Sequence, residues 1–124
     1  MDDLTAKAIE SPRLRMNLDL RNSTADGSQR MLNAIEPESI LPVHRHPKSS
    51  ETVVCLRGCL EEVYYDESGK PTNKFVLSPC GPVVALSIPM GQWHTARALE
   101  TGTVIMEAKD GAYEPIGVED IMDL

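Results

Sequence analysis

The side chains most able to do chemistry in this sequence are its three histidines. His44 and His46 are separated by one residue, and Glu51 follows five residues after the second of them. The third histidine, His94, lies far along the chain at the end of the segment PMGQWH. Neutral imidazoles and a carboxylate form a mixed nitrogen and oxygen donor set, which suits a divalent transition metal such as Fe, Mn, Ni, Co or Zn.

The spacing of these residues allows them to meet. Residues i and i+2 of a strand point to the same side, so His44 and His46 can both face one interior. Turn formers at Pro47–Ser50 would reverse the chain and bring Glu51 beside them in the next strand. A Pro-x-Gly turn precedes His94, which would enter from a different strand. We therefore predict one divalent metal held by these four residues, with two open positions on an octahedral ion; the alternative is that the histidines are structural.

Short strands must position these residues, and the sequence predicts such strands. Nine prolines and eight glycines punctuate the chain, which favours many short elements joined by turns. Leu4–Glu10 is expected to form one or two helical turns, and strict alternation over Arg13–Arg21 predicts a half-buried strand. Further strands are expected at Arg30–Ile35, Ile40–Arg45, Thr52–Arg57, Leu60–Tyr65, Lys74–Leu77, Val83–Ile88, Trp93–Leu99 and Thr103–Ala108.

Regularly spaced short strands without helices between them indicate an all-β sandwich or barrel. The length of 124 residues fits a single domain. Within residues 1–124 we expect an N-terminal arm and first strand at 1–28, a barrel core with both histidine clusters at 29–115, and a tail at 116–124. Residues 118–124 either form a last turn of helix or stay irregular.

Charge and composition exclude several kinds of protein. The formal net charge of −7 repels phosphate backbones and makes nucleic acid an improbable partner. No apolar run approaches the ~20 residues that span a bilayer, and the N-terminus lacks the basic and apolar stretches of a signal peptide. A cytoplasmic protein is expected. Cys55, Cys59 and Cys80 are then reduced thiols, which we interpret as packing residues.

The two histidine clusters together match a known pattern. The run His-x-His-x(4)-Glu-x(6)-Gly ends at Gly58, and Pro-x-Gly-x(2)-His ends at His94. This arrangement resembles the two motifs of the cupin superfamily. Residues from about Arg13 to Pro115 are similar to the WbuC family of cupin-fold metalloproteins. The segments that carry this closer resemblance are Arg30-Met31-Leu32-Asn33-Ala34, Pro42-x-His44-Arg45-His46, Trp93-His94-Thr95 and Glu107-x-Lys109-x-Gly111-x-Tyr113-x-Pro115.

The resemblance implies a double-stranded β-helix, that is, a jelly-roll barrel, with a short N-terminal helical and strand arm. It also implies a bound metal and an association with surface-polysaccharide gene clusters, whereas the reaction of the family is not settled. Glu38, Val83 and Ala98 stand where the superfamily pattern has Gly, Gly and Asn. These positions shape turns and strand packing, so the ligand set is intact.

Polar residues near the motifs are candidates for binding and catalysis. Gln29, Arg30 and Asn33 precede the first motif and could bind carboxylate, phosphate or sugar hydroxyls. Alternatively, Arg30 is a surface charge and Asn33 a turn or edge residue. Lys109 and Tyr113 are candidate catalytic groups, although a lysine in an exposed turn is an equal alternative. Glu107 is a candidate partner for a ligand histidine.

The sequence leaves two functions open. The first is a metal-dependent enzyme on a small polar metabolite such as a sugar or sugar-derived acid, acting as an isomerase, an epimerase or an Fe(II) dioxygenase. The second is a non-catalytic cupin that binds or senses a small molecule, often a carbohydrate. Because an exposed sheet edge needs covering, we also expect a homodimer that pairs through Arg13–Arg21.

Overall fold

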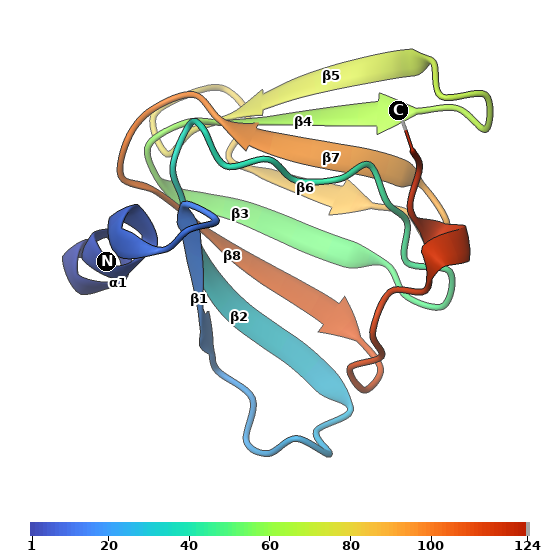
Figure 1. The fold of residues 1–124 in the computed structure, drawn as a ribbon, viewed down its shortest axis with the longest axis horizontal. Coiled ribbons are helices and arrows are strands. Elements are labelled where there is room, and N and C mark those ends of the chain that lie inside the picture. Colours follow the sequence, from blue (N-terminus) through green and yellow to red (C-terminus); the bar gives the residue numbers. More distant parts are fainter. Residues whose placement is uncertain (124) are drawn as a thin grey trace.

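The computed structural model describes residues 1–123, in which two antiparallel sheets face each other (Figure 1). The larger sheet has five strands in the order β1-β2-β8-β3-β6, and the smaller has three in the order β5-β4-β7. The elements are α1 (Asp2–Glu10), β1 (Arg15–Asp19), β2 (Ser28–Ile35), β3 (Glu51–Arg57), β4 (Leu60–Tyr65), β5 (Pro71–Leu77), β6 (Ala85–Ile88), β7 (Trp93–Ala98), β8 (Thr103–Asp110) and the 3-10 helix η1 (Val118–Asp120).

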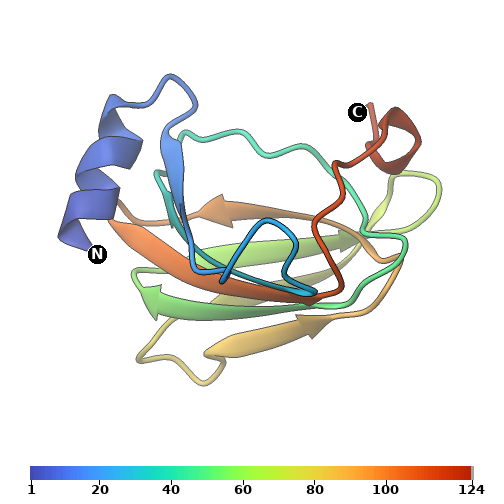
Figure 2. The ribbon, with the colours of Figure 1, turned by 90° about the horizontal axis from the view of Figure 1, so that it is seen from below.

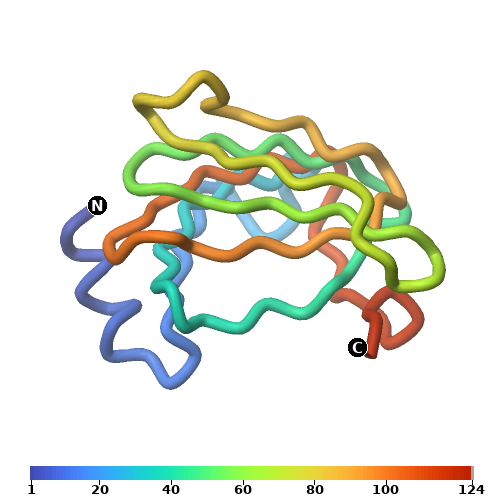
Figure 3. The backbone as a smooth tube through the Cα atoms, turned by 90° about the horizontal axis from the view of Figure 1, so that it is seen from above, coloured from blue at the N-terminus to red at the C-terminus, as the bar shows by residue number. Residues whose placement is uncertain are grey.

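The strands lie close to the predicted ones with one exception. The prediction of a strand at Ile40–Arg45 is wrong, because within this segment only His44 pairs as a β-bridge, with His94 and with Ile121. Pro42 lacks the N–H that a ladder needs. Residues 36–50 instead run the length of the molecule as an irregular connection, beside β7 (Figures 2 and 3).

The main core lies between the two sheets. Alternation puts every second residue of each strand inside, and the largest fully buried side chains include Leu60, Leu77, Ile88 and Ile105. Cys55 belongs to this core, as expected of a packing thiol. The packing interpretation is wrong for Cys80, which is exposed because it lies in the turn after β5.

Helix α1 covers part of the outer face of the larger sheet. Its buried residues Leu4 and Ala8 pack against Ala34 and Val104, which point away from the main core. No helix in the described part of the chain is long and apolar enough to cross a membrane. At the other end of the chain, η1 is a single turn of 3-10 helix, one of the two alternatives that the sequence left open for the tail. Leu124 lies outside the described residues.

Strand β1 is shorter than predicted and presents its polar side to the interior. Leu14 has a positive φ of 55°, so the extended backbone begins only at Arg15. Arg15 lies opposite Ile35 in the β1–β2 register, and opposite residues share a face. Ile35 belongs to the main core, so Arg15 also faces inward. On the outer face only Met16 packs under α1, whereas Leu18 is 49% exposed.

Gly58 closes the turn between β3 and β4, and its replacement tests this geometry. Its φ is +83°, and a Cβ there would lie 2.8 Å from the Cα of Thr103. We expect Gly58→Ala to lower the free energy of unfolding by about 2 kcal/mol, because backbone strain and a clash both oppose the side chain. Gly27→Ala is the control, since a Cβ there meets no atom within 4 Å. Equal urea midpoints for the two variants would contradict this view of the turn.

Candidate metal centre

Four residues from three segments meet at the end of the barrel where β3 and β7 begin, which is the right-hand end of these strands in Figure 1. Glu51 is the first residue of β3 and His94 the second residue of β7. His44 and His46 lie in the irregular connection between β2 and β3. The backbone of His44 pairs with that of His94 through two hydrogen bonds of 3.0 and 2.9 Å. This two-way bridge fixes the connection against β7 and brings the histidines together.

The side chains of these residues form a tight cluster. One ring nitrogen from each of His44, His46 and His94 lies within 4.8 Å of the others. The Oε2 atom of Glu51 lies 3.1 Å from Nε2 of His46 and 3.8 Å from Nε2 of His94. The structure therefore brings together all four residues that the sequence proposed as ligands.

Two atoms of this cluster have no hydrogen-bond partner among the described residues. They are Nε2 of His46 and Oε2 of Glu51, both fully buried. The two atoms are 3.1 Å apart, but they are not aligned for a hydrogen bond with each other. Leaving buried polar atoms unpaired is unfavourable. A cation between them would satisfy both atoms. The donor set and its orphaned atoms thus fit a metal ion.

Backbone carbonyls orient two of the imidazoles. The Nδ1 atom of His44 lies 2.9 Å from the carbonyl oxygen of Pro42, and Nδ1 of His94 lies 2.9 Å from that of Gln92. A carbonyl only accepts, so Nδ1 carries the proton in each ring and Nε2 keeps its lone pair. Such second hydrogen bonds are the usual way of fixing a metal-binding histidine.

Burial keeps the three imidazoles neutral. Loss of water lowers the pKa of His44 to about 4, with the neighbouring His94 adding to the effect. Burial also lowers the pKa of His46 to about 4, helped by Lys109, and that of His94 to about 4, helped by His46. Metal ligands must be deprotonated to bind. At neutral pH each ring is therefore already in its binding form.

An inner cavity of about 330 Å³ adjoins the cluster. His44, Glu51 and His94 line it together with two further carboxylic acids, Glu62 and Glu107. The remaining lining residues are Arg15, Asn17, Asn33, Ile35, Leu41, Pro42, Ala96, Ile105, Lys109, Ile116 and Ile121.

Both additional acids have raised pKa values. Burial raises the pKa of Glu107 to about 7, and the nearby Glu51 raises it further while Lys109 opposes the rise. Burial raises the pKa of Glu62 well above its usual value, with Glu51 and Glu107 contributing. Sequence reasoning missed Glu62. The available signal was its position two residues from Leu60 and from Tyr64, both core residues.

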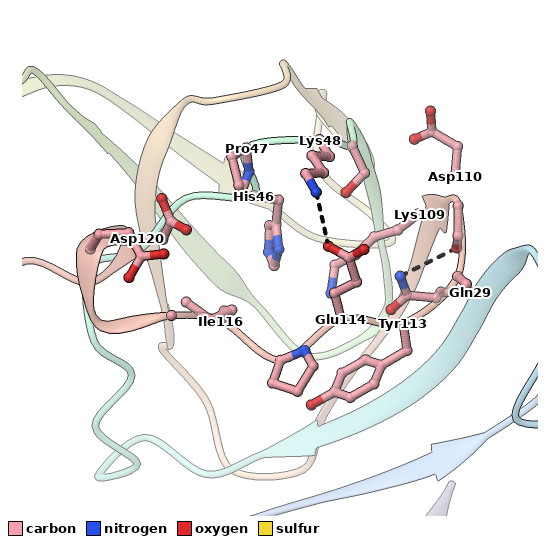
Figure 4. Close-up of a pocket in the computed structure, with 16 residues that line it drawn as sticks. Gln29, His46, Pro47, Lys48, Lys109, Asp110, Tyr113, Glu114, Ile116 and Asp120 are labelled. Atoms are coloured by element: carbon pink, nitrogen blue, oxygen red, sulfur yellow. Dashed lines mark hydrogen bonds and ion pairs between the residues drawn. The ribbon is translucent and has the colours of Figure 1, made fainter.

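An outer cavity of about 520 Å³ lies on the other side of His46. Figure 4 shows His46 pointing into it, with Asp120 on one side and Lys48 and Glu114 on the other. The C-terminal segment from residue 111 to 117 forms one wall of this cavity. An ion pair of 3.7 Å between Lys48 and Glu114 joins that wall to the turn after His46.

Of the three residues proposed for substrate binding, the structure brings two to these cavities. Gln29 lines the outer cavity and Asn33 the inner one. Arg30 lies on the opposite face of β2, because neighbouring residues of a strand alternate. Its guanidinium pairs with Asp26 at 3.0 Å, and Arg30 lines neither cavity. The alternative of a surface charge describes its position.

The proposed catalytic residues differ in position. Lys109 lines both cavities, and its Nζ lies 3.7 Å from Oε2 of Glu107. Tyr113 lines the outer cavity but is 56% exposed, with the guanidinium of Arg21 5.7 Å from its ring. Glu107 accepts a hydrogen bond from Asn33 at 3.0 Å, and it also interacts with Lys109 and with Glu51. No hydrogen bond joins it to a histidine within the described chain.

Sequence comparison identifies a family. The family model described as "Domain of unknown function (DUF6016)" matches residues 1–77, which is more than half of the 124 residues. The chain belongs to this family. The matched part of this DUF6016 member contains His44, His46 and Glu51, whereas His94 lies beyond it. No curated protein matches the sequence.

Solved structures establish the fold of this DUF6016 member. KdgF from Halomonas sp. superposes with a TM-score of 0.65 at 16% identity, over 83% of this chain and 84% of that one. Oxalate oxidase in complex with glycolate superposes with a TM-score of 0.69 at 16% identity, over 86% of this chain and 56% of that one. Oxalate decarboxylase of Bacillus subtilis, described with Mn(II) centres, superposes with a TM-score of 0.62 at 17% identity, over 89% of this chain and 28% of that one. These are cupin-fold proteins, so the predicted jelly-roll barrel is confirmed.

The low pKa values of the histidines predict how metal binding depends on pH. Protons compete with a metal only near and below a ligand's pKa, which is about 4 for His44 and His94. We expect metal affinity to be nearly constant from pH 7.5 to about 5.5 and to fall steeply toward pH 4. Titration with Mn(II) at each pH, followed by calorimetry, measures this. A steep loss centred near pH 6.5, the usual value for histidine, would contradict it.

Proposed function

We propose that this chain is a metal-dependent enzyme that acts on a small polar metabolite such as a sugar or sugar-derived acid. One divalent transition metal would be held by His44, His46, Glu51 and His94. The observation that carries the proposal is the pair of buried, unpartnered atoms on His46 and Glu51, which face each other beside a cavity. Open positions on the metal would be reached from the inner cavity, which His44 and His94 line.

The residues around the cavity supply what a reaction would need. A bound divalent metal would act as a Lewis acid on a carbonyl or hydroxyl oxygen of the substrate. Glu107 and Lys109, 3.7 Å apart, are the titratable pair placed to hold or move a proton next to that position. Asn33 holds the Glu107 carboxylate in place through its 3.0 Å hydrogen bond. Ile35 and Ile105 wall the cavity with apolar surface.

The comparisons support this proposal in outline. Proteins of the same fold include an oxidase complexed with the hydroxy acid glycolate and a decarboxylase with Mn(II) centres. Membership of the WbuC family and a place in surface-polysaccharide metabolism are finer proposals, which rest on the resemblance of the sequence motifs. The cytoplasmic location stays a prediction.

A binding or sensing role without catalysis is favoured by one observation. Lys109 and Glu107 are 3.7 Å apart, so each is the ionic partner of the other and neither is a free base. The Lys109→Met variant separates the two functions. An enzyme would keep its metal and lose turnover of its substrate, whereas a binding protein would show no turnover in either form.

Metal content tests the proposed function most simply. Protein purified without an affinity tag should contain about one equivalent of a transition metal by plasma mass spectrometry. The double variant His44→Ala/His94→Ala should contain less than a tenth of this, because two of the four donors are gone. Glu38→Gln is the control, since it removes an exposed carboxylate outside the cluster and should leave the metal content unchanged.

The identity of the metal then directs the assay for activity. Iron would lead to measurements of oxygen consumption, and zinc, nickel or manganese to assays of sugar isomerisation and epimerisation. No metal in the purified protein and no uptake on reconstitution would contradict the proposal and leave the histidines structural.

We also propose that two copies pair through β1. This strand is at the edge of the larger sheet. Leu18 on it is 49% exposed, and Leu20, which follows it, is 42% exposed. Pairing would cover an open edge and these side chains together. Light scattering at tens of micromolar should give twice the 13.6 kDa of one chain, and Leu18→Lys/Leu20→Lys should give a monomer. A monodisperse wild-type monomer would rule out this pairing.

A further inference from the structure

Glu62 is a buried acid that the proposed metal site does not use. It is the third residue of β4 and faces the interior, since Leu60 and Tyr64 on the same side of the strand belong to the core. Only 2% of Glu62 is exposed. Its Oε2 has no hydrogen-bond partner among residues 1–123. A carboxyl group kept in this state is unfavourable for folding, which points to a partner outside the protein.

The position of Glu62 separates it from the four candidate ligands. Glu51 lies within 4 Å of two histidines, whereas no ion pair joins Glu62 to a histidine within the described chain. Glu62 lines the inner cavity, so its carboxyl group borders any molecule bound there.

Arg15 is a second group without an ionic partner in the described chain, and it lines the same cavity. Its Nη1 donates to Oγ of Ser39 at 3.2 Å and to the carbonyl oxygen of Ile40 at 3.1 Å, which fixes the guanidinium. Its Nε and Nη2 make no hydrogen bond, and it forms no ion pair, within residues 1–123. These two nitrogens are therefore free to donate to an anionic ligand in the cavity.

The chemistry of these two groups defines the ligand. A fixed guanidinium binds a carboxylate through charge-assisted hydrogen bonds. A hydroxyl both donates and accepts, so it can pair with the Glu62 carboxyl whether that group is ionised or neutral. The volume of about 330 Å³ is at the low end of the range for ligand pockets, roughly 300–1,000 Å³. The ligand is therefore small.

We propose that the inner cavity selects a small hydroxylated carboxylic acid, with the ligand carboxylate at Arg15 and a ligand hydroxyl at Glu62. This inference rests on the proposed function and deepens it, because the same cavity is lined by His44 and His94. Neither Arg15 nor Glu62 was among the binding or catalytic residues predicted from the sequence. They would bind the two functional groups of one ligand from different sheets, since Arg15 lies on β1 and Glu62 on β4.

Three probes separate the two recognition elements. Gluconate carries a carboxylate and hydroxyls, glucose carries hydroxyls alone, and hexanoate carries a carboxylate alone. By calorimetry on the metal-loaded protein, we expect gluconate to bind about tenfold or more tightly than either of the others, the change expected for one lost charge-assisted hydrogen bond. Equal binding of the three probes, or no binding of gluconate, would overturn the proposal.

Variants assign each preference to one residue. Arg15→Gln should weaken gluconate binding about tenfold and remove the preference over glucose, and Glu62→Gln should remove the preference over hexanoate. Arg13→Gln is the control for Arg15, because Arg13 is exposed and only two residues away. Glu61→Gln is the control for Glu62, because Glu61 lines neither cavity and pairs instead with Lys74 and Arg97. Unchanged gluconate affinity in Arg15→Gln or Glu62→Gln would overturn the proposal.

A stability measurement distinguishes a binding role of Glu62 from a structural one. Glu62→Met replaces an unpartnered acid with an apolar side chain of similar length, so the ligand-free variant should melt at a higher temperature than wild type while binding gluconate more weakly. A lower melting temperature would show a structural role and overturn the proposal.

Metal content of the same samples distinguishes a failure of the proposed metal site from a failure of the proposed ligand selectivity. Wild-type protein that takes up no metal contradicts the proposed function and this inference with it. Metal-loaded protein without selectivity among the three probes contradicts this inference alone. Loss of metal in Glu62→Gln would make Glu62 a ligand and would also overturn the inference.

Discussion

The structure depends on the burial of three imidazoles and a carboxylate side by side at one end of the barrel. Burial removes water from the rings and lowers the pKa of His44, His46 and His94 to about 4. It also leaves Nε2 of His46 and Oε2 of Glu51 without partners in the described chain. A fold with this arrangement gives up stability, and the same arrangement presents neutral nitrogens and an anionic oxygen to a cation.

The sheets provide the rigidity that such a cluster needs. Glu51 lies opposite Lys109 in the β3–β8 register, and Lys109 lies opposite Gln29 in the β8–β2 register. One inward-facing row thus continues across three strands. His94 is held from the smaller sheet, and its two backbone hydrogen bonds to His44 connect it to the irregular segment. The cluster therefore joins the two sheets and the connection between them, so a bound metal would stabilise all three against one another.

The sequence predicted what depends on residue type and local alternation. Most strands lie where alternation placed them, because parity in a strand decides which side chains share a face. His44 and His46 do meet Glu51 and His94, but they do so from an irregular connection and not from the predicted strand. Parity alone does not tell which face is inside. The polar side of β1 lines the cavity through Arg15, while Arg30 on β2 faces out to Asp26. Glu62 was missed for the same reason, since its inward direction depends on packing between distant strands.

Anomalous diffraction from a crystal soaked in Mn(II), collected at the manganese absorption edge, tests the central claim most directly. We predict one strong peak bonded to Nε2 of His44, His46 and His94 and to a carboxylate oxygen of Glu51, at distances of about 2.0–2.3 Å. We also predict that Glu62 makes no bond to that ion. A peak at another place, such as the exposed acids of the tail, or no peak with the four side chains unchanged, would contradict the proposed metal site.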